Sequence, residues 1–251
     1  MKTEELLTKI LNQLMDKFKN HLVLKGGILL RLYNSPRSTQ DINFILLSKE
    51  SRKKWGPLFE KALLEIEEIE IEKINLNSRG IFIDVKERGG TQRCLIEISV
   101  LSATHLPPEP LSTAPLAQKY SLSPRIISAM SLPEAFSHKI AASLERDATR
   151  DLYDLSQMEG MGTFDEPTLS SRLSHLCLNR AKPKHITFQE AAQILKEKMN
   201  HLSQKRLEEE LYPLLPPEYQ PGVLRIIQAS VGRLVQRLEQ MSMNTPTETS
   251  G

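Results

Sequence analysis

The stretch Arg93-Cys-Leu-Ile-Glu-Ile-Ser-Val-Leu101 is the clearest buried strand in this chain. A short, mostly apolar run of this kind predicts a strand covered inside a sheet. Two β-rich runs over 69–76 and 80–87 precede it, and Asp41-Ile-Asn-Phe-Ile-Leu-Leu47 predicts another strand. Helical patterns separate these strands, so we expect the first half of the chain to be α/β.

Helical patterns begin at the N-terminus. Residues 3–19 place apolar side chains at spacings of three and four, which predicts an amphipathic helix. A short strand over 21–24 then leads into Gly26-Gly27, where a turn is expected. Residues 28–33 and 51–66 are the other helical segments expected in this half.

The sequence changes character after residue 101. Four prolines between residues 107 and 115 predict an extended connection. Beyond it almost every pattern is helical, with helices expected over about 131–146, 150–159, 166–178, 187–200, 203–211 and 221–241. Ser131 and Glu134 fit a capping box at the first of these helices.

This change predicts two domains. We expect an α/β domain over residues 1–125 and a helical domain over 126–243. Residues 244–251 are polar and terminal, and we expect them to be disordered. The last helix repeats apolar residues at alternating spacings of three and four, so its seam should pack against partner helices.

Composition excludes several classes of protein. The 251 residues include 33 Lys and Arg against 31 Asp and Glu, and the net charge of +2 says little about partners. Two cysteines, Cys94 and Cys177, exclude a disulfide framework and a Cys-x-x-Cys zinc or redox site. No apolar stretch approaches the roughly 18–20 residues that cross a bilayer, and no signal-peptide core is present. We therefore expect a cytoplasmic protein without a membrane partner.

Charge is nevertheless unevenly distributed along the chain. Residues 172–206 hold eight Lys and Arg against two Glu, a net charge of +6. This region could meet a phosphate backbone, and the alternative is a solvated helical face. Residues 60–73 have the opposite bias, with six Glu against two Lys.

Lys25-Gly26-Gly27 and the strand that begins at Asp41 could form a site. Adjacent glycines let backbone amides approach a ligand closely, and the start of the following helix favours an anion. Asp41 and Asn43 are two residues apart in a strand, so both point to one face of the sheet. Two oxygen ligands there can hold a divalent cation against a triphosphate. The alternative interpretation of Asp-x-Asn is turn chemistry at the start of a strand.

A second group of polar residues lies in the helical half. The helix over 131–146 places Lys139 and Arg146 on one stripe with small residues between them, which predicts a groove for an anion. Arg150 and Asp154 follow at i, i+4 spacing, and the simpler interpretation of this pair is a surface ion pair.

Four segments keep a particular order and separation along the chain. They are Leu24-Lys-Gly-Gly27, Arg37-Ser-Thr-Gln-Asp-Ile-Asn-Phe44, His138-Lys-Ile-Ala-Ala-Ser-Leu-Glu-Arg146 and Arg150-Asp-Leu-Tyr-Asp154. Together they resemble the AbiEii family of nucleotidyltransferase-like toxins, over about residues 5–235. The resemblance implies an α/β (α+β) nucleotidyltransferase-like palm with a mixed sheet, followed by a helical C-terminal domain.

The resemblance also implies an activity and partners. It implies Mg²⁺-dependent transfer of a nucleotide from an NTP to an acceptor, with a two-metal site. In related toxins the acceptor is tRNA, so RNA held by the basic region 172–206 is expected. A cognate antitoxin, often a winged-helix regulator, is the other expected partner in a toxin–antitoxin or abortive-infection system.

The resemblance assigns roles to residues of both halves. Lys25-Gly26-Gly27 is expected to bind the nucleotide, and the expected metal ligands are Asp41, which is also catalytic, Asn43 and Glu97. Asp84 is the rival to Glu97 as the third acidic ligand.

In the helical half, the resemblance assigns Lys139 and Asp154 catalytic roles. Arg146 and Arg150 are expected to bind the nucleotide.

Two residues depart from the family pattern. Asn43 replaces the second aspartate of Asp-x-Asp, which removes a negative charge and should weaken metal binding. Ile28 replaces the small hydroxyl residue that usually follows Gly-Gly, which removes a phosphate contact. The alternative function is therefore a catalytically degenerate member that binds nucleotide, RNA or a protein partner without turnover.

Overall fold

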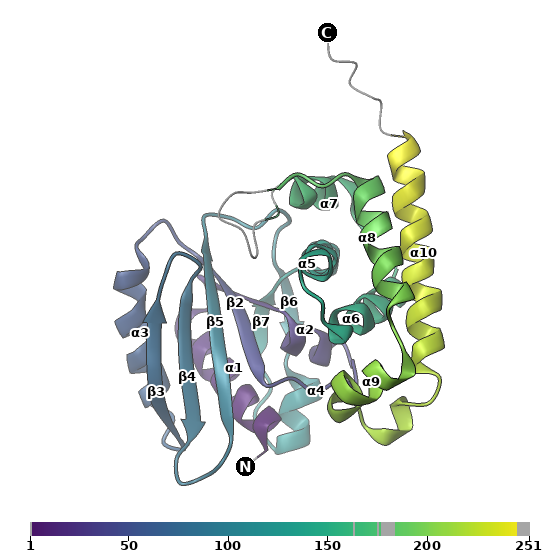
Figure 1. Cartoon of the computed structure of the whole chain (residues 1–251). Coiled ribbons are helices and arrows are strands. Elements are labelled where there is room, and N and C mark those ends of the chain that lie inside the picture. Colours follow the sequence, from purple (N-terminus) through teal and green to yellow (C-terminus); the bar gives the residue numbers. More distant parts are fainter. Residues whose placement is uncertain (1, 163, 175, 177–183, 245–251) are drawn as a thin grey trace. The chain divides into compact units, whose positions relative to one another are not determined.

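The computed structural model of this chain describes residues 2–162, 164–174, 176 and 184–244, and Figure 1 shows its elements. The chain divides into two compact units, Met1–Ser131 and Leu132–Gly251. The predicted tail over 244–251 lies, after its first residue, outside the described residues.

A seven-stranded mixed sheet forms the centre of the first unit. Its strands are β1 (Leu22–Lys25), β2 (Asp41–Leu47), β3 (Ile69–Leu76), β4 (Ile81–Glu87), β5 (Arg93–Leu101), β6 (Glu109–Ser112) and β7 (Ile126–Ala129). Their order across the sheet is β3-β4-β5-β2-β1-β7-β6. The β2–β5 and β1–β7 pairs are parallel and the other pairs are antiparallel. The predicted mixed sheet is therefore confirmed.

The sheet has one apolar face and one polar face. Helices α1 (Thr3–Phe18) and α3 (Arg52–Leu64) contact the strands, and the unit also contains α2 (Gly27–Leu32), α4 (Ala114–Ala117) and a 3₁₀ turn over Gln118–Tyr120. Alternate residues such as Ile42, Phe44 and Ile96 are fully buried. Their neighbours Asp41, Asn43 and Glu97 therefore point to the opposite, polar face, where they are only half-buried.

The first unit extends further along the chain than its sequence pattern predicts. The sequence predicts only an extended connection after residue 101 and a boundary at 125, whereas β6 and β7 complete the sheet and the first unit runs to Ser131. The prolines concealed these strands. Pro110 lies within β6, and a proline is tolerated there because β6 is an edge strand that pairs only with β7 among the described strands.

The second unit is helical, as predicted. Its helices are α5 (Leu132–Glu145), α6 (Thr149–Gly160), α7 (Glu166–Leu173), α8 (Phe188–Asn200), α9 (Gln204–Glu210) and α10 (Val223–Asn244), with 3₁₀ turns over Tyr212–Leu214 and Pro217–Tyr219. The apolar seam of α10, which includes Ile227, Val231 and Leu238, is buried where α10 meets α6 and α8. No helix in the described part of the chain has both the length and the apolar character needed to cross a bilayer.

Helix α5 begins where predicted but not with the predicted cap. The hydroxyl of Ser131 is buried without a hydrogen-bond partner, so it does not satisfy the first amides of the helix. A capping box is formed instead at α8, where the Glu190 amide donates to the Thr187 hydroxyl over 3.1 Å and the Thr187 amide donates to the Glu190 carboxylate over 2.8 Å.

A charged cluster fastens α1 to the rest of the first unit. The Glu4 carboxylate accepts hydrogen bonds from Arg31 and Lys119, both over 2.6 Å, and from the Tyr120 hydroxyl over 2.7 Å. Burial by itself would raise the pKa of Glu4, but these three donors favour its charged form and lower the pKa to about 2. The carboxylate is therefore ionised in the folded protein under all but strongly acidic conditions.

Replacing this carboxylate should cost stability in a pH-dependent way. The folded pKa of about 2 lies below the ordinary value of 4.5, so the stabilisation is present above pH 4.5 and lost as the pH falls toward 2. We expect Glu4→Gln to lower the free energy of unfolding by about 2 kcal/mol at pH 7, after allowance for the exposure of Lys119. Urea unfolding of both proteins at pH 7, 4.5 and 3 measures the difference, and a difference that does not narrow at pH 3 contradicts this account.

Candidate functional site

Polar side chains lie in register across three neighbouring strands on the polar face of the sheet, and Phe82 continues the row on the fourth. Lys25 of β1 is in register with Asn43 of β2, Asn43 with Glu97 of β5, and Glu97 with Phe82 of β4. Asp41 is two residues before Asn43 and so lies on the same face. The two predicted segments 24–27 and 37–44 are thus brought together with Glu97.

The turn after β1 requires both of its glycines. Gly26 has a φ of +79°, a conformation that residues with a side chain rarely adopt. A Cβ on Gly26 would lie 3.1 Å from the side chain of Asn43, and a Cβ on Gly27 would lie 2.8 Å from the Thr39 hydroxyl. The backbone of the turn therefore passes directly against Asn43 of β2 and against Thr39, just before that strand.

Side chains that the sequence analysis did not single out support this site. The Thr39 hydroxyl donates a hydrogen bond to the Asp41 carboxylate, and Lys25 Nζ donates to the Ser99 hydroxyl over 3.0 Å. Arg37 is almost fully buried, and its guanidinium lies near Gly27. Arg37 and Thr39 could have been identified from the sequence, because they alternate with Asp41 at the two-residue period of an extended chain and so lie on the same side as Asp41.

The oxygen atoms on this face fit a hard cation such as Mg²⁺. Asp41 and Glu97 supply carboxylates and Asn43 supplies an amide oxygen, the donors that Mg²⁺ prefers. Glu97 is on the strand next to Asp41, whereas Asp84 lies one strand further, in register with Leu95 of β5. Strands are about 4.8 Å apart, so Glu97 is one strand spacing across the sheet from Asp41 and Asp84 is two. Within the described residues no group of three His, Cys, Asp or Glu side chains is placed to hold a metal.

Cys94 is buried on the apolar face of β5, the face opposite to that of Glu97. Burial, together with the negative charges of Asp41 and Asp84, raises the pKa of its thiol to about 12. A thiol with this pKa carries almost no thiolate at neutral pH, so Cys94 cannot serve as a nucleophile.

The second unit contains its own buried charged cluster. Lys139 Nζ of α5 lies 2.8 Å from Asp154 Oδ2 and 3.1 Å from Asp151 Oδ1, both on α6. Asp151 and Asp154 are 1% and 0% exposed. Arg146 Nη2 donates to Asp151 Oδ1 over 3.3 Å, and its Nε stands 3.2 Å from Asp151 Oδ2 without hydrogen-bond geometry.

This cluster changes the interpretation of the predicted residues. Lys139 and Arg146 do share a stripe, but both are engaged by Asp151, a residue that the sequence analysis did not assign. Arg150 is exposed and Asp154 is fully buried, so the proposed surface ion pair between them does not describe Asp154, whose carboxylate accepts from Lys139.

Two further contacts fix the connection between α5 and α6. The Glu210 carboxylate of α9 accepts from the Thr149 amide over 3.1 Å and from its hydroxyl over 2.6 Å. Lys198 Nζ of α8 donates to the Arg146 carbonyl over 2.5 Å, and burial lowers the pKa of this lysine. The start of the helix that carries Asp151 and Asp154 is thus held by two other helices.

Several of the cations described within the predicted basic region form ion pairs. Lys196 bonds to Glu239, Arg206 lies 2.8 Å from Glu210 and 3.1 Å from Asp147, and Lys205 lies 3.8 Å from Glu209. Residues 175 and 177–183 of this region, with two of its eight cations, lie outside the described residues.

Known proteins resemble this chain in sequence pattern and in fold. The family model "Nucleotidyl transferase AbiEii toxin, Type IV TA system" matches residues 9–228. The fold is similar to that of MenT4, a nucleotidyltransferase toxin from Mycobacterium tuberculosis, with a TM-score of 0.60 and 18% identity over 95% of this chain and 92% of that chain. It is also similar to JHP933 from Helicobacter pylori, with a TM-score of 0.57 and 15% identity over 97% of each chain. No curated protein matches the sequence.

Proposed function

This chain belongs to the AbiEii family of nucleotidyltransferase toxins of type IV toxin–antitoxin systems, and from that premise we propose that it transfers a nucleotide from an NTP to RNA. The proposed acceptor is tRNA, and the proposed cofactor is Mg²⁺. The observation that carries this proposal is the row of oxygen ligands on the polar face, placed directly against the Gly26-Gly27 turn.

In the first unit, the proposed roles of the residues follow the order of the strands. Gly26 and Gly27 allow the triphosphate to lie close to the backbone. Lys25, one strand from Asn43, is proposed to balance the negative charge of the triphosphate. Asp41, Asn43 and Glu97 are the proposed metal ligands. Bound Mg²⁺ would neutralise the reacting phosphate and lower the pKa of the acceptor hydroxyl. The acceptor then approaches from the side opposite the leaving pyrophosphate, toward β4 and Phe82.

In the second unit, Lys139 is the proposed phosphate-binding cation and Asp154 the residue that orients it. The two buried carboxylates hold the Lys139 ammonium in one position. A fixed position allows a charged group to stabilise a reacting phosphate without first having to reorient. Arg146 and Arg150 are proposed to assist in nucleotide binding. The basic character of residues 172–206 supports RNA binding, and a winged-helix regulator is the proposed antitoxin.

The test is direct labelling of the acceptor. The purified chain is incubated with Mg²⁺, total tRNA and each α-labelled NTP in turn, with an Asp41→Ala variant alongside. We expect one NTP to label tRNA, and we expect that label to disappear with EDTA and in Asp41→Ala. Absence of label from all four NTPs, with tRNA and with total RNA, would contradict the proposal.

A second candidate function rests on Ile28 and Asn43. Ile28 is fully buried, so its side chain supplies no contact to a bound phosphate. Asn43 supplies no charge to a metal. A protein with these two features could bind nucleotide or RNA without turnover, and it would then show NTP binding with no label transfer.

Restoring a carboxylate at position 43 should separate the two functions. We expect Asn43→Asp to keep or raise the transfer rate, by up to about tenfold, because a third negative charge strengthens metal binding. The gain should be largest at low Mg²⁺ concentration, which a titration of rate against Mg²⁺ measures. Activity present only in Asn43→Asp would identify the natural chain as a silenced member of the family.

A further inference from the structure

Two cations of the second unit converge on one carboxylate oxygen. Lys139 Nζ of α5 lies 3.1 Å from Asp151 Oδ1 of α6, and Arg146 Nη2 lies 3.3 Å from the same atom. The two nitrogens are therefore at most 3.1 plus 3.3, or 6.4 Å, apart. The Arg146 amide donates to the Ala142 carbonyl over 2.9 Å, so the backbone at Arg146 continues the helix and is about 10 Å along its axis from that of Lys139. The two side chains therefore lean toward each other although their charges repel.

The carboxylates of this cluster lie beneath its cations. Asp151 and Asp154 are almost fully buried. The side chains of Lys139 and Arg146 are 14% and 38% exposed. Solvent therefore meets positive charge that buried negative charge holds in place, an arrangement that suits an anionic ligand.

Arg146 keeps hydrogen-bond donors for such a ligand. Within the part of the chain that the structure describes, its guanidinium makes one hydrogen bond, from Nη2 to Asp151 Oδ1. Its Nε and Asp151 Oδ2 are 3.2 Å apart, and neither of these buried atoms has a hydrogen-bond partner among the described residues. A guanidinium carries five N–H groups and an ammonium three, so the two cations can donate together to the oxygens of one phosphate group.

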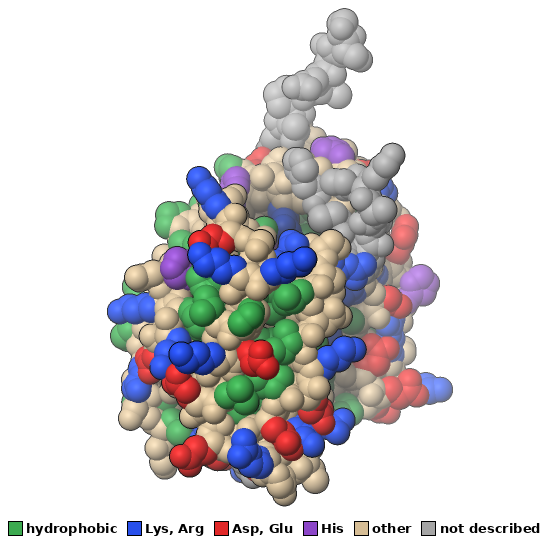
Figure 2. Space-filling view, turned by 90° about the vertical axis from the view of Figure 1, so that its left-hand side faces the viewer, with side chains coloured by type: hydrophobic (Ala, Val, Ile, Leu, Met, Phe, Trp, Pro, Cys, Tyr) green, Lys and Arg blue, Asp and Glu red, His purple; other side chains and the backbone are tan. Residues whose placement is uncertain are grey.

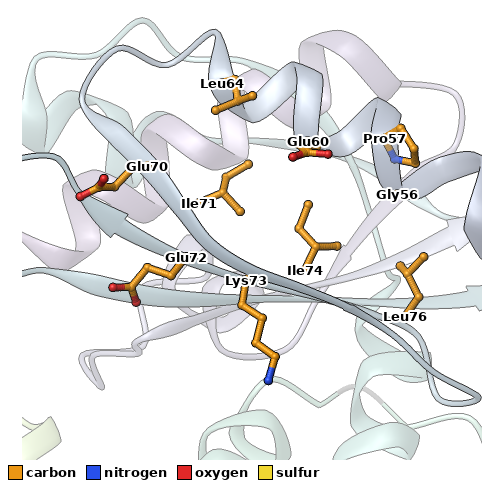
Figure 3. Close-up of a pocket in the computed structure, with 10 residues that line it drawn as sticks. All are labelled: Gly56, Pro57, Glu60, Leu64, Glu70, Ile71, Glu72, Lys73, Ile74 and Leu76. Carbon is orange, nitrogen blue, oxygen red and sulfur yellow. The ribbon is translucent and has the colours of Figure 1, made fainter.

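Charges are arranged differently on the surface that carries α3 and β3. Figure 2 faces that surface, where acidic and basic side chains lie side by side around apolar ones. Two of the glutamates that line the groove in Figure 3 are paired: Glu70 lies 2.8 Å from Lys86, and Glu72 lies 3.1 Å from Arg93. Both members of each pair are partly exposed, so these pairs offer an anion no separate layer of positive charge.

We propose that Asp151 is the positioning residue that holds Lys139 and Arg146 together, so that the two cations bind one phosphate group as a pair. Asp151 is almost fully buried and acts through the cations rather than on the nucleotide. Asp154 orients Lys139, whereas Asp151 sets the distance between Lys139 and Arg146. This role deepens the proposed function and rests on it for the identity of the anion, a phosphate group of the NTP.

The probe is inorganic tripolyphosphate, added to the full-length chain in EDTA, and isothermal titration calorimetry measures its dissociation constant. Asp151→Asn makes the chain one unit more positive, so charge alone predicts tighter binding. Loss of the shared charged contact predicts the opposite, about tenfold weaker binding, because Lys139 and Arg146 then repel each other and separate. Binding by Asp151→Asn that is as tight as that of the natural chain, or tighter, would overturn the proposal.

Asp147→Asn is the matched control. Asp147 follows Arg146 in the chain, its side chain is 74% exposed, and it pairs with Arg206 over 3.1 Å. The variant makes the same charge change beside the cluster and leaves the contacts of Asp151 in place, so the dissociation constant should stay the same or fall slightly. Weakening equal to that of Asp151→Asn would overturn the proposal.

A double-mutant cycle tests whether Asp151 acts through Arg146. Arg146 is partly exposed, so Arg146→Gln carries little risk to the fold, and we expect it to weaken tripolyphosphate binding about tenfold. Adding Asp151→Asn to this variant should weaken binding by no more than about threefold further, because the pair is already broken. A further loss of about tenfold would show that the two residues act independently and would overturn the proposal.

The natural chain provides a measurement that does not depend on the folding of any variant. Tripolyphosphate should protect Lys139 from acetic anhydride and Arg146 from phenylglyoxal at the same half-maximal concentration, which mass spectrometry of the modified peptides measures. Protection of one residue alone, or of the two at different concentrations, would overturn the proposal.

Steady-state transfer kinetics separate this role from the proposed function. In Asp151→Asn we expect the KM for the NTP to rise about tenfold, whereas a merely structural role would reduce the folded fraction and lower kcat at constant KM. Normal label transfer with an unchanged KM would overturn the role of Asp151 alone. Tripolyphosphate binding as expected, without label transfer by the natural chain, would reject the transferase and support the cation pair.

Discussion

Asp41→Ala is expected to lower the rate of nucleotide transfer by about two to three orders of magnitude, because it removes one of the two carboxylates proposed to hold the Mg²⁺ that would neutralise the reacting phosphate. The side chain is half-buried and accepts one hydrogen bond, from Thr39, so the loss of folding stability should be no more than about 1 kcal/mol. The measurement is label transfer to tRNA at saturating NTP, together with urea unfolding of the same preparation. Growth arrest on expression of the natural chain should also disappear.

Two matched variants refine this result. Asp41→Asn keeps the size of the side chain and an oxygen that accepts from Thr39, so a loss as large as that of Asp41→Ala would assign the effect to charge. Asp84→Asn removes a carboxylate on the same face, one strand further from Asp41 than Glu97 is. We expect Glu97→Gln to be severe and Asp84→Asn to be mild; the reverse order would identify Asp84 as the third ligand.

Lys139→Met is the second substitution with a large expected effect, on both stability and transfer. Methionine retains most of the apolar stem but removes the ammonium that lies between Asp151 and Asp154, which are almost fully buried. Removing one partner from a buried ion pair typically costs about 3–5 kcal/mol. We expect a fall of that size in the free energy of unfolding, measured by urea titration at pH 7.

A compensating substitution distinguishes the structural role of Lys139 from its proposed role in phosphate binding. In Lys139→Met with Asp154→Asn the negative charge left behind is removed, so at least half of the lost stability should return. Transfer activity should not return if Lys139 binds phosphate. Recovery of both stability and activity would show that Lys139 and Asp154 serve only to hold α5 against α6.

Most of the fold could be predicted because most elements carry strong local patterns. The predicted strands over 41–47, 69–76 and 93–101 coincide with β2, β3 and β5, and the family resemblance is confirmed by the family model. β6 and β7 were missed because prolines lie within or just before them, whereas β1, equally short, follows a clear helix and leads into Gly26-Gly27. Their strand character comes from pairing with each other and with β1, which local sequence does not encode.

The candidate site was predictable where it is local. Gly26-Gly27, Asp41 and Asn43 could be proposed from local spacing as candidates, whereas their roles and that of Glu97 required the resemblance. Asp151 was missed because its importance depends on Lys139, twelve residues earlier and on another helix. The burial of Asp154 could not be predicted either, because its i, i+4 spacing to Arg150 is also the spacing of an exposed ion pair on a helix surface.

The pairing of β1 with β7 bears on how the chain is made. Leu24 is in register with Ala129, and the Met130 amide donates to the Leu24 carbonyl over 2.9 Å, so the sheet closes across 129 minus 24, or 105, residues. At the usual pace of synthesis, about 5–20 residues per second, that interval takes roughly 5–20 s. During this time the strand that leads into the Gly26-Gly27 turn lacks one of its two neighbours. A nascent chain on the ribosome therefore cannot complete the proposed triphosphate site until the residues that connect to the helical unit have emerged.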